Sequence, residues 1–330
     1  MSSPGLVAVI ISTFNEEAYV ERCLGAVLSQ TVSPRVVVVD GGSVDGTVDR
    51  LRRIAASDER LVVIADGERR SLPAALNLAI DGCRETYIAK VDARTFIAPD
   101  FLERALDVFQ REGADVACAG GRPEQFGETH FGEGLARARM SRFGVGGSGY
   151  ADSRTSADVD TVQCGVYRSE ALRAVGGFDA SLQFGEDEEL NWRLRRAGHR
   201  IVVDTSIRIR YLARSSWLAA FRQYRNYGRA RARVVEKHPE FLRGRHLAPS
   251  AAILTATCLL LTAPSSITAR AAACSLAALY AGGAAMAATI ATRDRLRLWP
   301  HTTAAFAALH AGYGIGVLEG FLARVRRSFA

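Results

Sequence analysis

Short apolar runs alternate with amphipathic segments along the first third of the chain. The apolar runs predict strands at 6–13, 35–40, 61–65, 87–92 and 115–119. The segments between them predict a first helix that Asn15 caps, with Glu16 and Glu17 in its opening turn, and further helices at 47–56, 72–83 and 100–111. Strands that are apolar throughout are typical of a parallel sheet covered on both faces. The alternation therefore predicts an α/β fold, with a Rossmann-like, mostly parallel sheet and helices on both faces.

This alternation stops between Gly120 and Asp160, where glycine and serine cluster. Such a composition predicts a mobile loop over a site rather than a core element. Regular structure is expected again from Val159 onward. The later pattern predicts helices at 169–175 and 186–197 and strands near 200–204 and 207–211.

A strongly amphipathic helix is predicted over residues 217–236. One face carries Trp217, Phe221 and Tyr224, and arginines recur at helical spacing on another face, at positions 222, 225, 229 and 233. An aromatic face beside a row of arginines suits a helix that lies at a membrane interface. The alternative is an ordinary amphipathic helix that packs on the core.

Three apolar stretches follow, at 247–263, 271–292 and 302–323. Crossing a bilayer takes roughly 20 apolar residues, so the second and third are long enough and the first is marginal. Glycines recur every four residues in the third stretch, at positions 312, 316 and 320, and such a stripe permits close helix contact in lipid. A buried helical hairpin of a soluble protein is the alternative.

The topology of these stretches is left open by their flanking charges. Arginines at 293, 295 and 297 and again at 324, 326 and 327 both favour the cytosol. Three full crossings would violate that rule at one end, whereas a re-entrant first stretch would leave two crossings. We expect a catalytic domain at 1–215, an amphipathic juxtamembrane segment at 216–246 and a transmembrane region of two or three spans at 247–330.

Charge and cysteine content narrow the class of protein. The net charge of +7 comes with arginines concentrated between Arg193 and Arg245, beside the apolar tail. This placement indicates an anionic membrane surface, and not nucleic acid, as the partner. The six cysteines show no CxxC spacing, which favours buried thiols in a reducing compartment. Because no signal-peptide pattern precedes the first strand, we expect the globular part to stay in the cytosol.

Polar side chains gather where the predicted strands end, which is the edge at which open α/β sheets bind ligands. Thr13, Asn15 and Glu16 end the first strand and Asp40 ends the second, so together they offer hydrogen-bonding groups for a base and a ribose. Gly42 lets the backbone approach a ligand closely. Helix capping by Asn15 and turn formation by Asp40 are the structural alternatives.

Two further acidic positions suit group transfer. Asp92 follows a strand that is apolar except for Lys90, and a carboxylate there can bind Mg²⁺ or Mn²⁺ that bridges a diphosphate. Residues 186–189 are four acids in the first turn of a helix, where the dipole favours carboxylates and mutual repulsion raises their pKa values, as suits a general base. A capping aspartate and a plain acidic helix start are the alternatives. We expect Asp40, Asp92 and Asp187 to converge around one activated sugar.

Seven motifs in a fixed order give the chain a specific resemblance. They are ISTFNEE (11–17), VVDGGSVDGT (38–47), AALNLAI (74–80), VDAR (91–94), CGVYR (164–168), VGGFD (175–179) and GEDEELNWRLRRAG (185–198). Over residues 6–245 the chain resembles family-2 glycosyltransferases of the GT-A fold. It is similar in particular to the membrane-bound bacterial branch that includes succinoglycan-type exopolysaccharide glucosyltransferases.

The resemblance implies an inverting, single-displacement transfer of a hexose from a nucleotide sugar, usually a UDP-sugar. By the same pattern Asp92 is the first acid of the DxD metal motif, and Asp187, beside Glu186, is the catalytic base. Donor contacts are implied for Thr13, Asn15, Glu16, Asp40, Gly42, Asn77, Arg94, Gln223 and Arg225. Gln223 and Arg225 match loosely, because the segment reads QYRNY where related enzymes carry a Q-x-x-R-W-like pattern.

The chain departs from the family pattern at Arg94, where an aspartate or histidine normally helps to bind the metal. Arginine stays protonated and cannot ligate a cation. Either Asp92 holds the metal with waters and phosphates, or Arg94 neutralises part of the diphosphate charge. We hypothesise a weakened requirement for the divalent cation.

The expected function is sugar transfer to a lipid-linked or polysaccharide acceptor at the cytosolic face of the cytoplasmic membrane, in cell-surface or exopolysaccharide biosynthesis. Membrane lipids are expected partners, and nucleic acid is not. The alternatives are a polyprenyl-phosphate glycosyltransferase and a non-catalytic GT-A membrane scaffold. A nucleotide-dependent dehydrogenase shares the βαβ start, but the G-x-G-x-x-G that it requires is missing after the first strand. The donor sugar, the acceptor and the oligomeric state stay open.

Overall fold

The computed structural model describes residues 5–145 and 156–328. The chain divides into two compact units, each discontinuous in sequence. The first unit comprises Met1–Glu124 and Gly149–Tyr211, and the second comprises Gln125–Ser148 and Leu212–Ala330.

An eight-stranded sheet forms the centre of the first unit, with the strand order β3-β2-β1-β4-β9-β6-β10-β8. Its strands are β1 Val7–Thr13, β2 Arg35–Asp40, β3 Leu61–Ile64, β4 Tyr87–Lys90, β6 Val116–Gly120, β8 Ala157–Asp158, β9 Val166–Arg168 and β10 Arg200–Val203. The first four strands pair in parallel, as do β6 and β10. Strand β9 runs antiparallel to both β4 and β6, and β8 is antiparallel to β10, so the sheet is mixed. The carboxyl ends of β1, β2 and β4 therefore meet at one edge.

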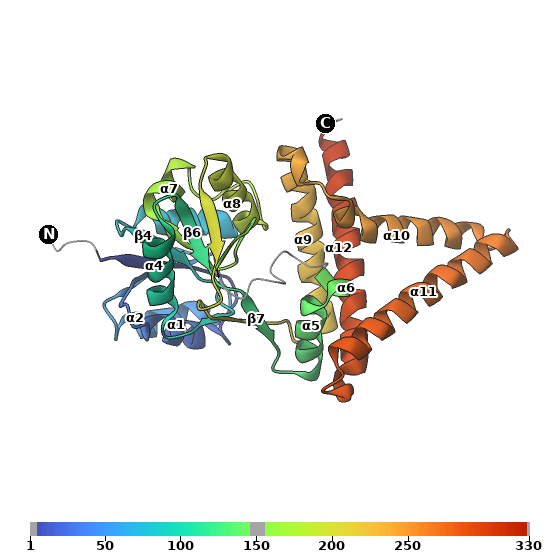
Figure 1. Ribbon diagram of the computed structural model, residues 1–330, viewed down its shortest axis with the longest axis horizontal. Coiled ribbons are helices and arrows are strands. Elements are labelled where there is room, and N and C mark those ends of the chain that lie inside the picture. The colour runs from blue at the N-terminus through green and yellow to red at the C-terminus, as the bar shows by residue number, and fades with distance from the viewer. Residues whose placement is uncertain (1–4, 146–155, 329–330) are drawn as a thin grey trace. The chain divides into compact units, whose positions relative to one another are not determined.

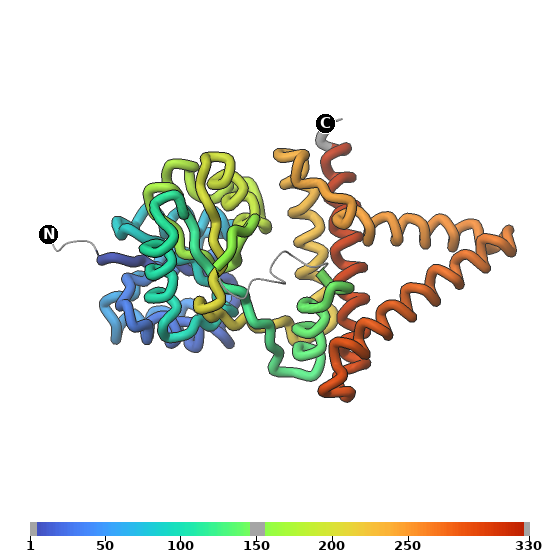
Figure 2. Tube along the Cα trace, viewed as in Figure 1, coloured from blue at the N-terminus to red at the C-terminus, as the bar shows by residue number. Residues whose placement is uncertain are grey.

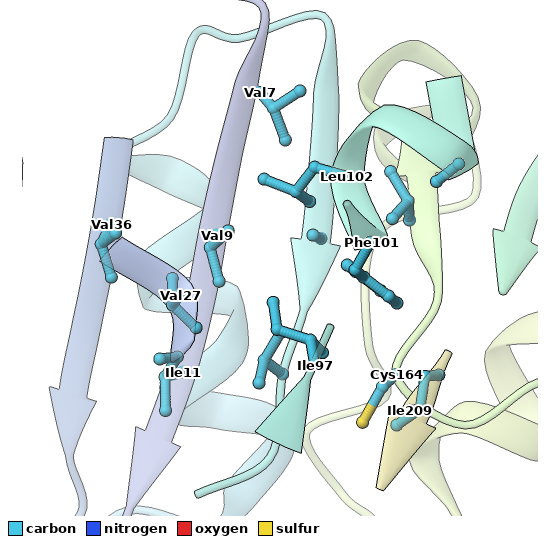
Figure 3. Packing of buried hydrophobic residues seen from close by; sticks show 14 of the residues in the cluster. Val7, Val9, Ile11, Val27, Val36, Ile97, Phe101, Leu102, Cys164 and Ile209 are labelled. Carbon is cyan, nitrogen blue, oxygen red and sulfur yellow. The ribbon is translucent and has the colours of Figure 1, made fainter. Parts of the chain in front are cut away.

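Helices cover both faces of this sheet, as the sequence predicts. They are α1 Val20–Leu28, α2 Thr47–Ala55, α3 Leu72–Asp81, α4 Phe101–Glu112, α7 Ser169–Ala174 and α8 Glu186–Arg196. Successive residues of β1 point to opposite faces and enter two separate cores: Val9 packs with residues of α1 and α4, and Ile10 packs with residues of α3 and α8. Figure 3 shows the first of these cores, with Val7, Val9 and Ile11 beside Phe101 and Leu102.

The prediction that Asn15 caps the first helix is wrong. Helix α1 begins at Val20, and Asn15 adopts a left-handed backbone conformation with φ of 53°. Asparagine tolerates this conformation better than most residues because its short side chain can bond locally. Here Asn15 Oδ1 accepts a hydrogen bond from the backbone of Val44, at 2.9 Å, so the residue ties the end of β1 to the loop after β2.

A smaller sheet has the strand order β5-β11-β7, with β5 Thr95–Ile97, β11 Ile209–Leu212 and β7 Pro123–Phe126. Strand β5 comes directly after the motif that contains Asp92 and pairs antiparallel with β11. This pairing fixes the chain immediately after the acidic position.

The second unit is helical. It contains α5 His130–Met140, α6 Arg142–Val145, α9 Trp217–Lys237, the short 3₁₀ turns η2 Pro239–Phe241 and η3 Leu296–Leu298, α10 Gly244–Thr262, α11 Ile267–Ala291 and α12 Trp299–Ser328. Helix α12 packs against α9 along its length and also contacts α5, α10 and α11. Helices α10 and α11 project from this group and meet at a shared tip, and the trace shows them apart at their other ends (Figures 1 and 2).

The mobile loop predicted between Gly120 and Asp160 is wrong for residues 123–145, which form β7, α5 and α6. The side chain of Thr129 caps α5, and Leu135 packs in a core with Phe306 and Leu309 of α12. Because α5 is stabilised by a helix distant in sequence, its own glycine-rich composition gives little sign of it. Residues 157–158 of that predicted loop form β8, and its residues 146–155 lie outside the described residues.

The glycines of α12 permit close contact between helices, as their spacing predicts, and the partner is α9. A Cβ added to Gly316 would lie 2.0 Å from the carbonyl oxygen of Arg225, and one on Gly312 would lie 2.6 Å from that of Phe221. Gly228 of α9 is equally close to α12, since its Cβ would lie 2.2 Å from Tyr313 O. The arginine row of α9 is partly engaged in the same contact, because Arg225 and Arg229 pair with Glu319.

Candidate active site

The site centres on a buried lysine surrounded by three carboxylates. Lys90, the last residue of β4, is only 1% exposed. Its Nζ lies 2.7 Å from Asp187 Oδ2, 2.9 Å from Glu186 Oε1 and 3.1 Å from Asp92 Oδ1. Burial alone would lower the pKa of Lys90, but the three carboxylates outweigh it and hold that pKa well above its usual value. The ammonium group is therefore a fixed positive charge between the two acidic motifs.

Sequence reasoning did not assign Lys90 a role, although the signal is present. A lysine within an otherwise apolar, fully buried strand must have a partner, because an unpaired buried charge is strongly destabilising. That requirement points to acidic residues nearby. It does not say which acidic residues they are, since Glu186 and Asp187 are almost 100 positions away.

Asp187 is held by one oxygen only. Its Oδ2 accepts the hydrogen bond from Lys90, whereas Oδ1 is buried and has no hydrogen-bond partner among the described residues. Burial raises the pKa of Asp187 to about 7, with the carboxylates of Glu186 and Asp92 acting in the same direction and Lys90 opposing them. The raised pKa thus comes mainly from desolvation, and less from the run of adjacent acids that the sequence suggested. An oriented carboxylate with one open acceptor can take a proton from a hydroxyl group.

Helix α8 holds this carboxylate in place through two anchors. Asn191 is fully buried and its Nδ2 donates to Thr161 Oγ1, at 2.8 Å. Arg193 donates to the backbone oxygens of Val175 and Gly177. In this motif the acids Glu186 and Asp187 both contact Lys90, and the polar residues Asn191 and Arg193 fasten the helix.

Asp92 lies two residues after β4 and contributes the third carboxylate. Burial alone would raise its pKa, but the charge of Lys90 and hydrogen bonds from Lys90, Gln163 and Cys164 hold that pKa below its ordinary value. Gln163 Nε2 lies 3.4 Å from Asp92 Oδ2. Asp92 is therefore an anion at neutral pH.

A divalent cation fits this site only with help from a ligand. Within residues 5–145 and 156–328, no group of three or more His, Cys, Asp or Glu side chains could hold a metal ion. Asp92 offers one carboxylate, and Mg²⁺ is commonly bound by one or two carboxylates together with substrate phosphates and waters. The residues present fit a cation shared with a diphosphate, and they do not form a cage of protein groups.

Arg94 is turned toward the first motif. Its Nε lies 3.0 Å from Glu16 Oε2, and its guanidinium stacks 3.9 Å from the centre of the Tyr19 ring. These contacts join the loop after β4 to the loop after β1. They also place a permanent positive charge beside the predicted nucleotide-binding residues.

The predicted residues at the ends of β1 and β2 form one hydrogen-bonded network. The Asp40 carboxylate is 1% exposed and accepts from Thr13 Oγ1, from Ser43 Oγ and from the backbone N–H groups of Gly42 and Ser43. The structural role of Asp40 is thus to form the turn after β2. Asn15 joins the network because its backbone N–H donates to Ser43 Oγ at 2.8 Å. Contact of these residues with a nucleoside stays a prediction.

Three other predicted donor contacts have visible structural roles. The Asn77 amide makes two hydrogen bonds to the backbone of Phe178, at 2.7 and 2.8 Å, and so fixes the VGGFD turn. Gln223 and Arg225 belong to the second unit, on α9, where Gln223 bonds Tyr227 and Arg225 pairs with Glu319. For all three, a role in donor binding stays a prediction.

Asp92 and Asp187 are thus brought together through Lys90. Asp40 lies at the same edge of the sheet, since β2, β1 and β4 are adjacent and parallel. The Arg94–Glu16 pair links the two halves of that edge. A site of this form combines a hydrogen-bonded loop, a carboxylate that could bind a cation together with a phosphate ligand, and a second carboxylate that could act as a base.

Comparison with known proteins identifies the family to which the chain belongs. Residues 8–176 match the family described as glycosyl transferase family 2. The chain is 33% identical over 235 residues to the succinoglycan biosynthesis protein ExoA of Rhizobium meliloti, which covers 70% of each chain. It is 26% identical over 239 residues to the dolichyl N-acetyl-α-D-glucosaminyl phosphate 3-β-D-2,3-diacetamido-2,3-dideoxy-β-D-glucuronosyltransferase of Methanococcus voltae, and the match covers 70% of this chain and 74% of the relative.

Solved structures show the same fold. The mannosyltransferase PcManGT of Pyrobaculum calidifontis, in complex with GDP-Man and Mn²⁺, superimposes with a TM-score of 0.63 at 20% identity, covering 98% of this chain and 89% of that one. TarS of S. aureus, in complex with UDP-GlcNAc, gives 0.51 at 15% identity, covering 96% and 92%. The protein belongs to glycosyl transferase family 2: it is a glycosyltransferase with a GT-A-like fold.

Proposed function

We propose that this glycosyltransferase inverts the anomeric centre in a single displacement, with Asp187 as the general base. The observation that carries the proposal is the asymmetry of Asp187: Lys90 holds Oδ2, and Oδ1 is a buried acceptor with no partner among the described residues. The acceptor hydroxyl would give its proton to Oδ1 while its oxygen attacks the anomeric carbon. The bond between that carbon and the diphosphate oxygen breaks, and the nucleoside diphosphate leaves with the electron pair.

The donor side of the reaction falls to the loops after β1, β2 and β4. Thr13, Asn15, Glu16 and Asp40 would bind the nucleoside, which we propose is uridine. Asp92 would hold a divalent cation together with the donor's phosphates. When bound, that cation would neutralise charge that develops on the leaving diphosphate. Arg94 would add a second positive charge at the same end, and this supports a weakened dependence on the metal.

The acceptor is proposed to be a lipid-linked or polysaccharide chain at the cytosolic face of the cytoplasmic membrane, in exopolysaccharide or related glycan biosynthesis. Two features support this. The succinoglycan relative bears the name of an exopolysaccharide pathway, and the methanococcal relative is named for a dolichyl-phosphate-linked sugar acceptor. In addition, Ile267–Ala291 and Leu296–Arg326 are long and apolar enough to cross a membrane by length and composition.

A comparison of Asp187→Asn with the unchanged protein in detergent tests the base. We expect nucleotide release to fall by at least a thousandfold, while the affinity for the donor, measured by calorimetry, changes less than threefold. Glu170→Gln, an exposed acid on α7, is the control and should keep full activity. Unchanged turnover in Asp187→Asn would refute the role of Asp187, and absence of turnover in the unchanged protein with every donor would favour a non-catalytic scaffold.

The identities of the donor and of the acceptor are determined one after the other with the same preparation. A screen of UDP- and GDP-sugars, scored by nucleotide release, identifies the nucleotide of the donor. Acceptor profiling with membrane extracts then distinguishes transfer to a lipid-linked saccharide from transfer to polyprenyl phosphate itself, because the product of the second reaction carries a single sugar on phosphate.

A further inference from the structure

The two helices that are long and apolar enough to cross a membrane differ in what covers them. Helix α11 leaves most of its apolar side chains exposed, with Leu279 75% and Met286 65% exposed. Helix α12 has no exposed residue between positions 301 and 321. Helices α9, α5, α10 and α11 pack around it. Helix α12 is therefore the central helix of the second unit and offers less of its surface to lipid than α11 does: 44% of its most apolar window is buried, against 11% for α11.

Helix α12 is also bound to a charged helix. Its glycines bring it into backbone contact with α9, which carries arginines at positions 222, 225, 229, 231 and 233. The pair is held by ion pairs from Arg225 and Arg229 to Glu319. Placing α12 across a bilayer would draw these arginines into the hydrocarbon, where a charged side chain is energetically costly. The contact with α9 therefore disfavours α12 as a membrane span.

The hairpin of α10 and α11 has the opposite character. Leu254, Leu260 and Leu261 of α10 are exposed, as are Leu279 and Met286 of α11. From 246 to 292 the sequence contains one Asp, Glu, Lys or Arg residue, Arg270. We propose that α10 and α11 form the membrane-inserted element, and that α12 stays with α9 outside the hydrocarbon.

Positive charges at the start of α10 and after the end of α11 support insertion of the hairpin with its tip pointing into the membrane. Arg243 and Arg245 precede or begin α10, and Arg293, Arg295 and Arg297 follow α11. Arginine-rich flanks mark the cytosolic side of a span. With α10 and α11 as the inserted pair, both flanks and the C-terminal arginines lie on one side. The conflict created by an odd number of crossings then disappears.

Length and attachment fit as well. Helix α11 has 25 residues and so is about 37 Å long, which exceeds a hydrocarbon thickness of about 30 Å and allows it to tilt. The 19 residues of α10 span about 28 Å. The two helices are attached to α12 at separate points: Ser250 Oγ donates to Gly314 O, and Trp299 Nε1 donates to Thr289 Oγ1. Figure 1 shows α11 running obliquely between the tip and the start of α12.

Cysteine accessibility tests the proposal in the full-length protein in native membrane vesicles. The two native exposed thiols, Cys258 on α10 and Cys274 on α11, lie within the hairpin and serve as reporters. We expect both to resist a membrane-impermeant maleimide in intact vesicles and to react in detergent. Resistance that persists in detergent would overturn the proposal, because burial in protein would then explain it. Ready labelling in intact vesicles would do the same.

Single cysteines introduced into a Cys258→Ser, Cys274→Ser background then locate α12. Leu296→Cys precedes α12, Val325→Cys lies near its end, and Glu59→Cys marks the first unit; all three positions are exposed. We expect all three to be labelled from the same side of the membrane. Labelling of Leu296→Cys and Val325→Cys from opposite sides would show that α12 crosses, and would overturn the proposal.

The proposal rests on the proposed function only in assuming that the enzyme works at a membrane. Labelling requires no turnover, so an inactive preparation still reports the topology. A failed base assignment at Asp187 would leave the labelling result intact, and a crossing α12 would leave the Asp187 result intact.

Discussion

The Nζ of Lys90 lies 2.7 Å from Oδ2 of Asp187, although the two residues are 97 positions apart in the sequence. This contact joins strand β4 to the start of α8. Through Lys90 it also connects Asp92, the proposed ligand of the divalent cation, with Asp187, the proposed base. A buried lysine with three carboxylate neighbours leaves a net negative site that can accept a cation or a hydroxyl proton. The relationship makes Lys90 a positioning residue for Asp187.

Replacing Lys90 by methionine removes its charge while keeping a side chain of similar length. In Lys90→Met the three carboxylates lose their shared cation, so the pKa of Asp187 should rise further and the base should be protonated at neutral pH. We expect kcat at pH 7 to fall at least a hundredfold, the acidic limb of the pH–rate profile to move to higher pH, and stability to drop by about 3–5 kcal/mol, as when a buried ion pair is broken. Steady-state kinetics from pH 6 to 9 and chemical denaturation measure these effects.

Two controls keep this test specific. Lys237→Met removes an exposed lysine at the end of α9 and should change neither quantity. Lys90→Arg keeps the charge and should restore part of the activity and the original pH limb. A Lys90→Met enzyme with a normal pH profile would contradict the positioning role, even if it were less stable.

The pH dependence of the unchanged enzyme follows from the pKa of Asp187, which burial raises from 3.8 to about 7. Because the base must be deprotonated, kcat/KM should fall about tenfold per pH unit below pH 7 and level off above it. The same shift has a cost in stability: the folded state holds this proton more tightly than the unfolded chain, so stability declines as pH rises from about 4 to 7 and then stays constant. Asp187→Asn should lack this decline. An activity plateau that extends down to pH 5 would contradict the assignment.

The metal requirement can be shifted at Arg94. Arg94→His supplies a ligand where the family normally has one, so we expect Mn²⁺ to saturate turnover at a concentration at least tenfold lower than in the unchanged enzyme. Arg94→Gln removes the charge without adding a good ligand, and should weaken donor binding while leaving a stronger dependence on the metal. Turnover measured against buffered Mn²⁺ and Mg²⁺ distinguishes these outcomes. Complete inactivity of the unchanged enzyme in chelator, with tight rescue by metal, would refute the idea that Arg94 substitutes for a metal ligand.

The order of strands and helices in the first unit was predictable because each local pattern agrees with the fold. The apolar run before Asp40 is buried on both sides, and the acidic turn at Asp187 does begin a helix. Two kinds of feature were not predictable. The backbone of Asn15 is set by the loop after β2, and the helix at 130–140 is set by packing on α12, so both depend on partners distant in sequence. The Lys90 cluster was partly predictable: its need for partners is visible, and their identity is not.

Because α9 packs closely on α12, two glycine-to-alanine substitutions should differ in their effect on stability. Gly316→Ala would place a Cβ 2.0 Å from the backbone oxygen of Arg225, which cannot move without displacing the helix. We expect a loss of about 1–3 kcal/mol from overpacking, or separation of the two helices. Gly282→Ala is the control, because nothing lies within 4 Å of its Cβ and alanine favours the helix. Thermal unfolding in detergent should show a lower Tm for Gly316→Ala and an unchanged or higher Tm for Gly282→Ala; equal effects would contradict the packing.

Substitution of Asn77 tests whether this residue has a structural role or binds the donor. Its amide makes two hydrogen bonds to the backbone of Phe178, and Arg193 of α8 bonds the adjacent Gly177. Asn77→Ala should therefore cost about 2 kcal/mol, near 1 kcal/mol for each hydrogen bond lost, and should loosen the support of α8. If the role is structural, kcat falls because Asp187 is less well held, whereas the affinity for nucleoside diphosphate stays within threefold of the original. Calorimetric titration with UDP measures that affinity, and a tenfold or greater loss at unchanged stability would instead establish Asn77 as a donor-binding residue.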